Sequence, residues 1–273
     1  MVHRQGVLGA LAIVVVTLAL DGCGGQPTVN LCGVGVRGKL IHYRTTDGVR
    51  LNGAAAGHGD RGVVFANGWN QASRGRIVPV SLRTAAPSSG IYCTWLSDPR
   101  LADRLLRSGF QLFLFDYRGT GKSSAGCGAA EHRYDLDVAA VVNAARRHHA
   151  RDVVLVGGSF GGVVVIATAL NLDPRPTAIV TLSAAGFAGT NSGRDYGNLD
   201  AKTAVEQIDV PLLLIASRRE GVGFADSRAL DAAASTRTTE FEVVPGSAHS
   251  TELLGAAAVR QSIVAFIEQH VER

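Results

Sequence analysis

The pentapeptide Gly157–Gly161 constrains the fold more than any other stretch, because it matches G-x-S-x-G in a specific setting. Before it stands the apolar, β-branched run 152–156, which is typical of a buried strand. After it, the apolar stretch 162–170 is long enough for a buried helix. A strand, a tight turn and a helix with Ser159 at the apex predict a nucleophile elbow. The alternative, in a chain with 33 glycines, is a glycine-rich turn that merely contains a serine.

The predicted helix also provides part of an anion site. Backbone N–H groups and a partial positive charge at a helix N-terminus face any oxyanion that forms beside the serine. We therefore expect the N–H of Phe160, directly after Ser159, to be one oxyanion donor. The second donor should come from the loop after the strand 62–66, and we assign it to Trp69.

The order of predicted elements indicates an α/β fold. A chain of 273 residues can bury one large core. Strands alternate with helices, so we predict a mostly parallel sheet with helices on both faces and an antiparallel hairpin at its edge. The predicted strands are 39–44, 49–56, 62–66, 110–115, 152–156, 177–182, 211–216 and 240–244, and the predicted helices are 97–109, 135–149, 162–170, 224–234 and 251–271.

A nucleophilic serine needs a histidine base, and the histidine needs an orienting carboxylate. His249 lies in a loop between the last predicted strand and the last predicted helix, whereas His270 lies in a helix three residues from the end of the sequence. Two carboxylates follow the strand 211–216. We favour Glu220 over Asp226, because strand-to-helix loops are usually about 2–6 residues long and Asp226 falls in the next helix.

Residues 38–273 resemble the α/β-hydrolases of the serine-esterase type. The resemblance rests on the motifs described above and on two more: Asn67-Gly68-Trp69, where the family often has His-Gly, and the loop 116–123 after a central strand. It implies the chain order serine, acid, histidine, which Ser159, Glu220 and His249 follow. Asn67, Ser217 and Glu220 depart from the usual histidine, glycine and aspartate.

Composition argues against several other classes. Basic residues are scattered and the net charge is only +4, so we predict no nucleic-acid partner. No cysteine or histidine spacing indicates a metal, and we expect no cofactor. The stretch 119–123 lacks the first glycine of a phosphate loop. Gly33–Gly38 matches G-x-G-x-x-G without a preceding strand or following helix, and we interpret it as linker.

The N-terminus predicts export. We interpret residues 1–22 as a signal peptide, because Arg4 precedes an apolar stretch too short to span a membrane comfortably. Residues 23–37 are then a linker before the domain 38–273. The segment resembles a bacterial lipoprotein signal with a lipid anchor at Cys23, although Asp21 departs from that pattern. The alternatives are plain secretion and an uncleaved anchor.

Export would place the cysteines in an oxidising compartment. We expect a disulfide between Cys93 and Cys127, because each lies near the end of a connection on the same strand-end side of the sheet. Cys32 is the competitor for either partner, and three free thiols are the alternative.

Together these observations predict an exported serine hydrolase that cleaves a small-molecule carboxylic ester, or a thioester or amide. A peptidase or acyltransferase with the same residues is the nearest alternative, and a non-catalytic surface-binding lipoprotein is the alternative from another class. The insertion 184–209 has room for one helix and no cap domain, so we expect an open site, unless the loop 71–94 covers it. The sequence does not indicate an oligomeric state.

Overall fold

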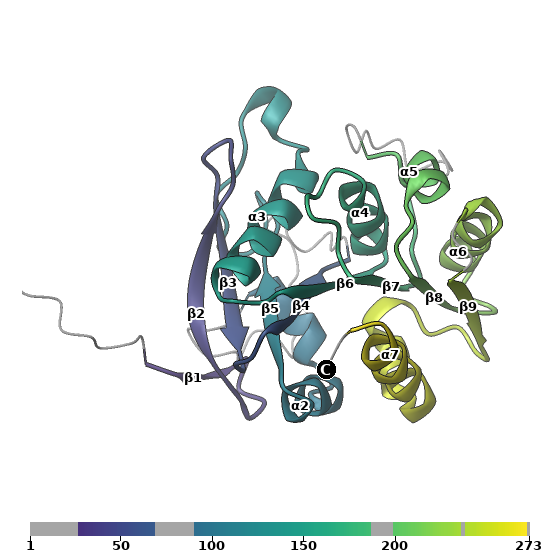
Figure 1. Ribbon diagram of the computed structural model, residues 1–273, viewed down its shortest axis with the longest axis horizontal. Coiled ribbons are helices and arrows are strands. Elements are labelled where there is room, and N and C mark those ends of the chain that lie inside the picture. The colour runs from purple at the N-terminus through teal and green to yellow at the C-terminus, as the bar shows by residue number, and fades with distance from the viewer. Residues whose placement is uncertain (1–26, 69–89, 187–198, 236–237, 272–273) are drawn as a thin grey trace, which may run out of the picture.

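The computed structural model describes residues 27–68, 90–186, 199–235 and 238–271. They build one sheet of nine strands in the order β1-β2-β3-β5-β4-β6-β7-β8-β9. The neighbours β5, β4, β6, β7, β8 and β9 pair in parallel. The pairs β1–β2, β2–β3 and β3–β5 are antiparallel. The mostly parallel sheet and its antiparallel edge are therefore as predicted (Figure 1).

The elements alternate along the chain. The strands are β1 Val29–Leu31, β2 Val36–Arg44, β3 Arg50–Ala56, β4 Arg61–Ala66, β5 Phe110–Phe115, β6 Asp152–Gly158, β7 Ala178–Leu182, β8 Leu212–Ser217 and β9 Thr239–Val244. The α-helices are α2 Arg100–Arg107, α3 Tyr134–Arg147, α4 Phe160–Ala169, α5 Ala201–Gln207, α6 Val222–Ala233 and α7 Ala257–His270. The described residues also form three short 3₁₀ helices, η2 Ile91–Leu96, η3 Gly128–Ala130 and η4 Ser250–Gly255.

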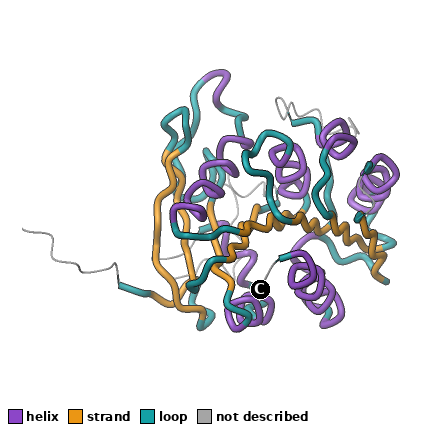
Figure 2. Tube along the Cα trace, viewed as in Figure 1, coloured by secondary structure: helices purple, strands orange, loops and turns teal. Residues whose placement is uncertain are grey.

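Helices cover both faces of the sheet (Figures 1 and 2). α3, α4, α5 and α6 lie on one face, and α2 and α7 lie on the other. All residues of the inner strands β5, β7 and β8 are buried, as expected of parallel strands covered on both sides. Two apolar clusters result, one on each face of the sheet. No helix among the described residues is long and apolar enough to cross a membrane.

The sheet begins earlier than predicted. Within the expected linker 23–37, β1 pairs antiparallel with the start of β2, which also takes in part of Gly33–Gly38. Leu31 and Val36 are buried in the core beneath. A strand of only three residues beside glycines shows no alternating pattern, so the sequence did not reveal it. The expected signal peptide and Cys23 lie outside the described residues.

The expected disulfide between Cys93 and Cys127 is wrong. Cys32 is bonded to Cys93 instead, with a Cα–Cα distance of 5.7 Å, and Cys127 is free and exposed. Cys93 is buried in the same apolar cluster that Leu31 and Cys32 contact, whereas Cys127 lies on an exposed loop before η3. Pairing therefore follows the apolar cluster that η2 shares with the end of β1.

Candidate active site

Ser159 forms the turn between β6 and α4 and has backbone angles of φ 51° and ψ −121°. A non-glycine residue with positive φ is uncommon and carries strain of roughly 1–3 kcal/mol, which surrounding structure must hold in place. Its N–H donates to the carbonyl of Leu182 at 2.8 Å, which anchors the turn to β7. The serine is half-buried at the start of the helix, the position expected of a nucleophile elbow.

The glycines around Ser159 are needed for close packing. A Cβ on Gly157 would collide with the backbone of Gly161 and Gly162, and a Cβ on Gly161 would collide with the carbonyl of Ala66. The backbones of β4, the turn and α4 therefore meet with no room for a side chain. This is the physical reason for the glycines in the motif.

Phe160, the predicted oxyanion donor, is the first residue of α4. Its ring is buried in an aromatic cluster, at 5.2 Å from the ring of Tyr134 and 5.9 Å from that of Tyr117. These edge-to-face contacts fix the start of the helix and with it the direction of its first N–H groups. Trp69, the other predicted donor, lies outside the described residues.

The carboxyl ends of β6, β7, β8 and β9 meet at one edge of the sheet, since these strands are parallel neighbours. Ser159 follows β6, Glu220 follows β8 and His249 follows β9. The Nδ1 atom of His249 lies 3.4 Å from Oε2 of Glu220. The side chain of Glu220 is only 1% exposed and that of His249 is 43% exposed. A buried acid thus faces a ring that solvent or a substrate can reach.

The structure does not join all three predicted triad members. Among the hydrogen bonds of the described residues, none links Ser159 to His249. The Nδ1–Oε2 contact is also longer than a hydrogen bond of about 2.7–3.2 Å. Contacts of this kind are often long without substrate and tighten in its complex. The backbone N–H of His249 donates to the carboxylate of Glu252 at 3.0 Å, which fixes the loop that carries the ring.

Asp226, the alternative acid, is 2% exposed and lies within α6. Its Oδ2 accepts a hydrogen bond of 2.8 Å from the N–H of Gly186. The contact ties α6 to the start of the connection that follows β7. Asp226 therefore has a structural partner in the connection, and the carboxylate beside His249 is Glu220.

Ser183 is a residue at this edge that the sequence analysis missed. It follows β7 directly, is fully buried and has a φ of 54°. Its Oγ lies 2.5 Å from Oε2 of Glu220 and 3.1 Å from the N–H of Ser250. A single serine after a strand forms no recognisable sequence motif. Its position after β7 nevertheless places it beside the residues that follow β6, β8 and β9.

Two polar residues near the elbow have structural roles. Asn67 donates from Nδ2 to the carbonyl of Phe115 at 2.6 Å and accepts from Thr94 at 3.3 Å. Asp116 accepts from the N–H groups of Tyr92 and Lys122 and from Asn52. Burial raises the pKa of Asp116, and these hydrogen bonds oppose the rise. Both residues hold the loops beside the site.

Arg118, in the loop 116–123, is buried and paired with two carboxylates. Its Nε donates to Asp137 at 2.8 Å and its Nη1 to Asp47 at 2.8 Å. The pairs fasten this loop to α3 and to the β2–β3 turn. Both pairs are internal to the fold, so this buried arginine is not exposed for binding a phosphate group.

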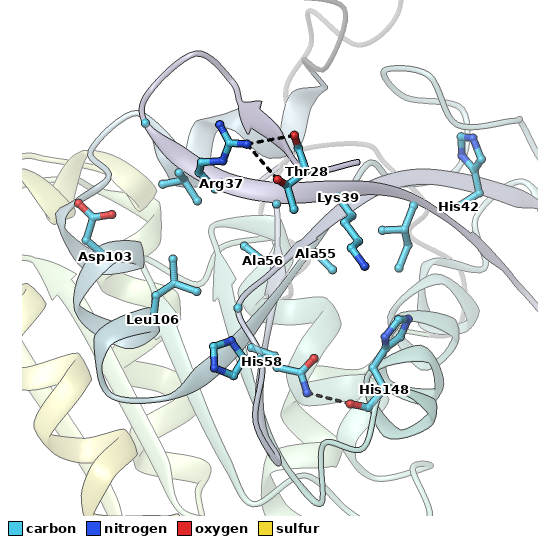
Figure 3. Close-up of a pocket in the computed structure, with 16 residues that line it drawn as sticks. Thr28, Arg37, Lys39, His42, Ala55, Ala56, His58, Asp103, Leu106 and His148 are labelled. Carbon is cyan, nitrogen blue, oxygen red and sulfur yellow. Dashed lines mark hydrogen bonds between the residues drawn. The ribbon is translucent and has the colours of Figure 1, made fainter. Parts of the chain in front are cut away.

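A separate hollow of about 840 Å³ lies at the opposite end of the parallel strands (Figure 3). It is lined by residues of β2 and β3, by Gln111 near the start of β5, and by His148 after α3. Lys39 and His58 also line it. No predicted site residue lines it. The described residues contain no cluster of acidic, histidine or cysteine side chains arranged to hold a metal ion.

The sheet order, the turn at Ser159 and the loops at the carboxyl ends of the strands define an α/β-hydrolase fold. The family described as "Serine aminopeptidase, S33" matches residues 91–199, which include the elbow but not Glu220 or His249. No curated protein matches the chain in sequence.

Solved structures share the same fold at low sequence identity. An esterase of Pyrococcus furiosus superimposes with a TM-score of 0.66 and 16% identity, over 91% of this chain and 100% of that chain. A predicted hydrolase of Thermoplasma acidophilum gives 0.62 and 19%, over 86% and 100%. An esterase of Exiguobacterium antarcticum gives 0.60 and 16%, over 84% and 99%. At such identities the likeness establishes the fold.

Proposed function

We propose that the protein is a serine hydrolase that cleaves small carboxylic esters through an acyl-enzyme. One observation carries the proposal: Ser159 occupies a strained turn at the N-terminus of α4, at the sheet edge where Glu220 contacts His249. Three of the five non-glycine residues with positive φ in the described segments, Ser159, Ser183 and Ser250, lie at this edge. Backbone strain of this kind clusters at active sites.

In the proposed reaction, the Oγ of Ser159 attacks the ester carbonyl and its proton passes to His249. The carboxylate of Glu220 orients the ring and stabilises the imidazolium. The N–H of Phe160 and that of Trp69 donate to the oxyanion. His249 then protonates the alcohol that leaves. In the second half, His249 accepts a proton from water as the water oxygen attacks the acyl carbonyl, and it returns the proton to Oγ of Ser159 as the acid product leaves. The solved esterases with this fold support an ester substrate.

Labelling with a fluorophosphonate tests the proposal, because the reagent reacts with an activated serine. We expect the wild type to be labelled at Ser159. We expect Ser159→Ala to be unlabelled and to lose p-nitrophenyl ester hydrolysis by several orders of magnitude, as other triads do. The variant should unfold at the wild-type temperature, since alanine is as small as serine. Wild-type hydrolysis by this variant would disprove the proposal and favour a binding protein of the same fold.

A peptidase is the second candidate, because the family match is described as serine aminopeptidase. The same residues can cleave an amide if the leaving amine is protonated. Comparing kcat/KM for amino-acid p-nitroanilides with that for p-nitrophenyl esters of the same acyl group separates the two. A larger value for the anilides would favour the peptidase.

We also propose that the protein is exported, either as a lipoprotein anchored at Cys23 or in secreted form. The disulfide between Cys32 and Cys93 supports export, because structural disulfides form in oxidising compartments. Expression in a bacterium with radiolabelled palmitate tests the anchor. Labelling that is lost in Cys23→Ser supports it, whereas an unlabelled protein in the medium supports secretion.

A further inference from the structure

We propose that Ser183 is a positioning residue that joins the acid and the histidine loop of the active site. The inference rests on the proposed function and concerns a residue outside the Ser159–His249–Glu220 triad. Ser183 is the first residue after β7, between the strand that precedes Ser159 and the strand that precedes Glu220. Ser183 therefore lies between Ser159 and Glu220 along the row of carboxyl ends of the parallel strands.

The direction of both hydrogen bonds follows from chemistry. An ionised carboxylate only accepts, so the hydroxyl of Ser183 donates to Oε2 of Glu220 over 2.5 Å. The N–H of Ser250 only donates, so the same hydroxyl accepts from it over 3.1 Å. A serine hydroxyl has one proton to donate and lone pairs to accept, and it makes both bonds at once.

Both bonds act on atoms that matter for catalysis. Oε2 of Glu220 is the oxygen that lies 3.4 Å from Nδ1 of His249. Ser250 directly follows His249, so its N–H is part of the peptide bond that joins the two residues. The hydroxyl of Ser183 thus holds the acid at one end and the histidine loop at the other. It sets the position of the carboxylate relative to the ring without touching the substrate.

The backbone of Ser183 supports this assignment. Its φ of 54° lies in the left-handed region, where glycine costs less than any side chain. Its N–H donates to the carbonyl of Ile215 in β8 at 2.7 Å, which sets the residue firmly in the sheet. Glycine would suit this backbone conformation better than serine does. The buried serine therefore needs another explanation, and its hydroxyl supplies one.

Two substitutions separate the hydroxyl from the backbone. Ser183→Ala removes the hydroxyl and retains the strained Cβ, and Ser183→Gly removes the hydroxyl and suits the positive φ. If the hydroxyl positions the triad, both variants lose about tenfold to a hundredfold in kcat for a short-chain p-nitrophenyl ester, as expected when a hydrogen bond to a charged group is lost. KM stays within about twofold of wild type, because no substrate contact is removed. Fluorophosphonate labelling slows by a similar factor.

Ser217→Ala is the matched control. Ser217 ends the neighbouring strand β8 and is fully buried, and its hydroxyl has no hydrogen-bond partner within the described part of the chain. Removing this hydroxyl should leave kcat and KM unchanged. Thermal unfolding of all three variants checks that the fold survives, and Ser183→Gly should be at least as stable as Ser183→Ala.

The assay includes Ser159→Ala, so that two kinds of failure are distinguished. Wild-type kcat in both Ser183 variants, with Ser159→Ala inactive, would overturn the positioning role alone. Loss of activity in Ser183→Ala with wild-type kcat in Ser183→Gly would show that backbone strain matters and the hydroxyl does not, which also overturns it. Full activity of Ser159→Ala would overturn the proposed function and this inference together.

Discussion

At the scale of single residues, the proposed site depends on a few positions where the backbone conformation or the packing restricts which residue fits. Gly161 has no room for a Cβ against Ala66, and Ser159 sits in a conformation that the surrounding packing imposes. These requirements are local and therefore visible in the sequence as G-x-S-x-G. The contact between Glu220 and His249 joins residues after two different strands, and it was predicted only through the order in which such residues follow the strands.

The two candidate acids can be compared directly. We expect Glu220→Gln to lower kcat by roughly 10²–10⁴-fold, because only the carboxylate at His249 stabilises the imidazolium. We expect Asp226→Asn to lower it less than about tenfold, because the amide oxygen can still accept from the N–H of Gly186. Both variants are measured on one p-nitrophenyl ester. The reverse order would assign the role to Asp226.

Ser183 and Asp116 show what the sequence could not reveal at this scale. Both are polar residues that directly follow buried strands, and each is buried with hydrogen bonds to segments distant in the sequence. Their roles depend on which loops meet at the sheet edge. That meeting is a property of the folded chain, and no local spacing encodes it.

At the scale of elements, most boundaries lie within a few residues of those predicted from apolar periodicity. β5 matches its prediction at both ends, and α3 begins one residue before its predicted start. Long apolar runs are predictable because burial on both faces requires them. β1 was missed because three residues carry too little pattern. The disulfide was mispaired because pairing depends on the apolar cluster that brings η2 to the end of β1.

Asp116 makes the stability depend on pH. Burial raises its pKa in the folded protein, so between about pH 4 and that raised pKa the folded state binds more protons than the unfolded state. Its contribution to the free energy of unfolding is therefore largest at low pH and is lost as the pH rises. We expect the stability of the wild type relative to Asp116→Asn to fall as the pH rises above about 4 in urea titrations.

Removing any aspartate also removes one negative charge. Asp231→Asn, on α6, serves as the control for that general effect. A wild-type advantage over Asp116→Asn that grows with pH would show that the hydrogen bonds from Tyr92, Lys122 and Asn52 outweigh burial.

The disulfide should contribute substantially to stability. Cys32 and Cys93 are separated by 61 positions, and loop-closure entropy for such a ring corresponds to about 4 kcal/mol. We expect the double variant Cys32→Ser/Cys93→Ser to lose stability by an amount of that order in guanidinium titrations. Cys127→Ser is the control, and it should change stability by less than about 0.5 kcal/mol because Cys127 is exposed and free. A Cys93–Cys127 peptide in mass spectrometry of the unreduced protein would contradict the assignment.

At the scale of the whole molecule, the proposed catalytic residues follow the parallel strands of the sheet, and the antiparallel strands carry none of them. The antiparallel strands β1–β3 close one edge of the sheet and contribute none of the proposed triad. The proposed catalytic side chains come from the carboxyl ends of β6, β8 and β9, and the hollow of Figure 3 lies at the other end of the strands. Strand and helix alternation was enough to predict this architecture.

We expect the connection after β7 to control access to the proposed site. Its described part holds a single short helix, α5 Ala201–Gln207, and residues 187–198 of the connection and 71–89 of the long loop lie outside the described residues. We expect short-chain soluble esters to be preferred, since one short helix is too small for a lid of the lipase kind. A chain-length series of p-nitrophenyl esters, with and without micelles, tests this. A sharp rise in rate above the micelle threshold, with long chains preferred, would show a lipase.

The bond between Cys32 and Cys93 also changes the topology of the covalent chain. It closes residues 32–93 into a ring that contains β2, β3 and β4 together with the segment of the second proposed oxyanion donor, Trp69. A single cut by a protease anywhere from residue 33 to residue 92 opens this ring but releases no fragment. The nicked protein should migrate as one species on a denaturing gel until a reductant separates it into two.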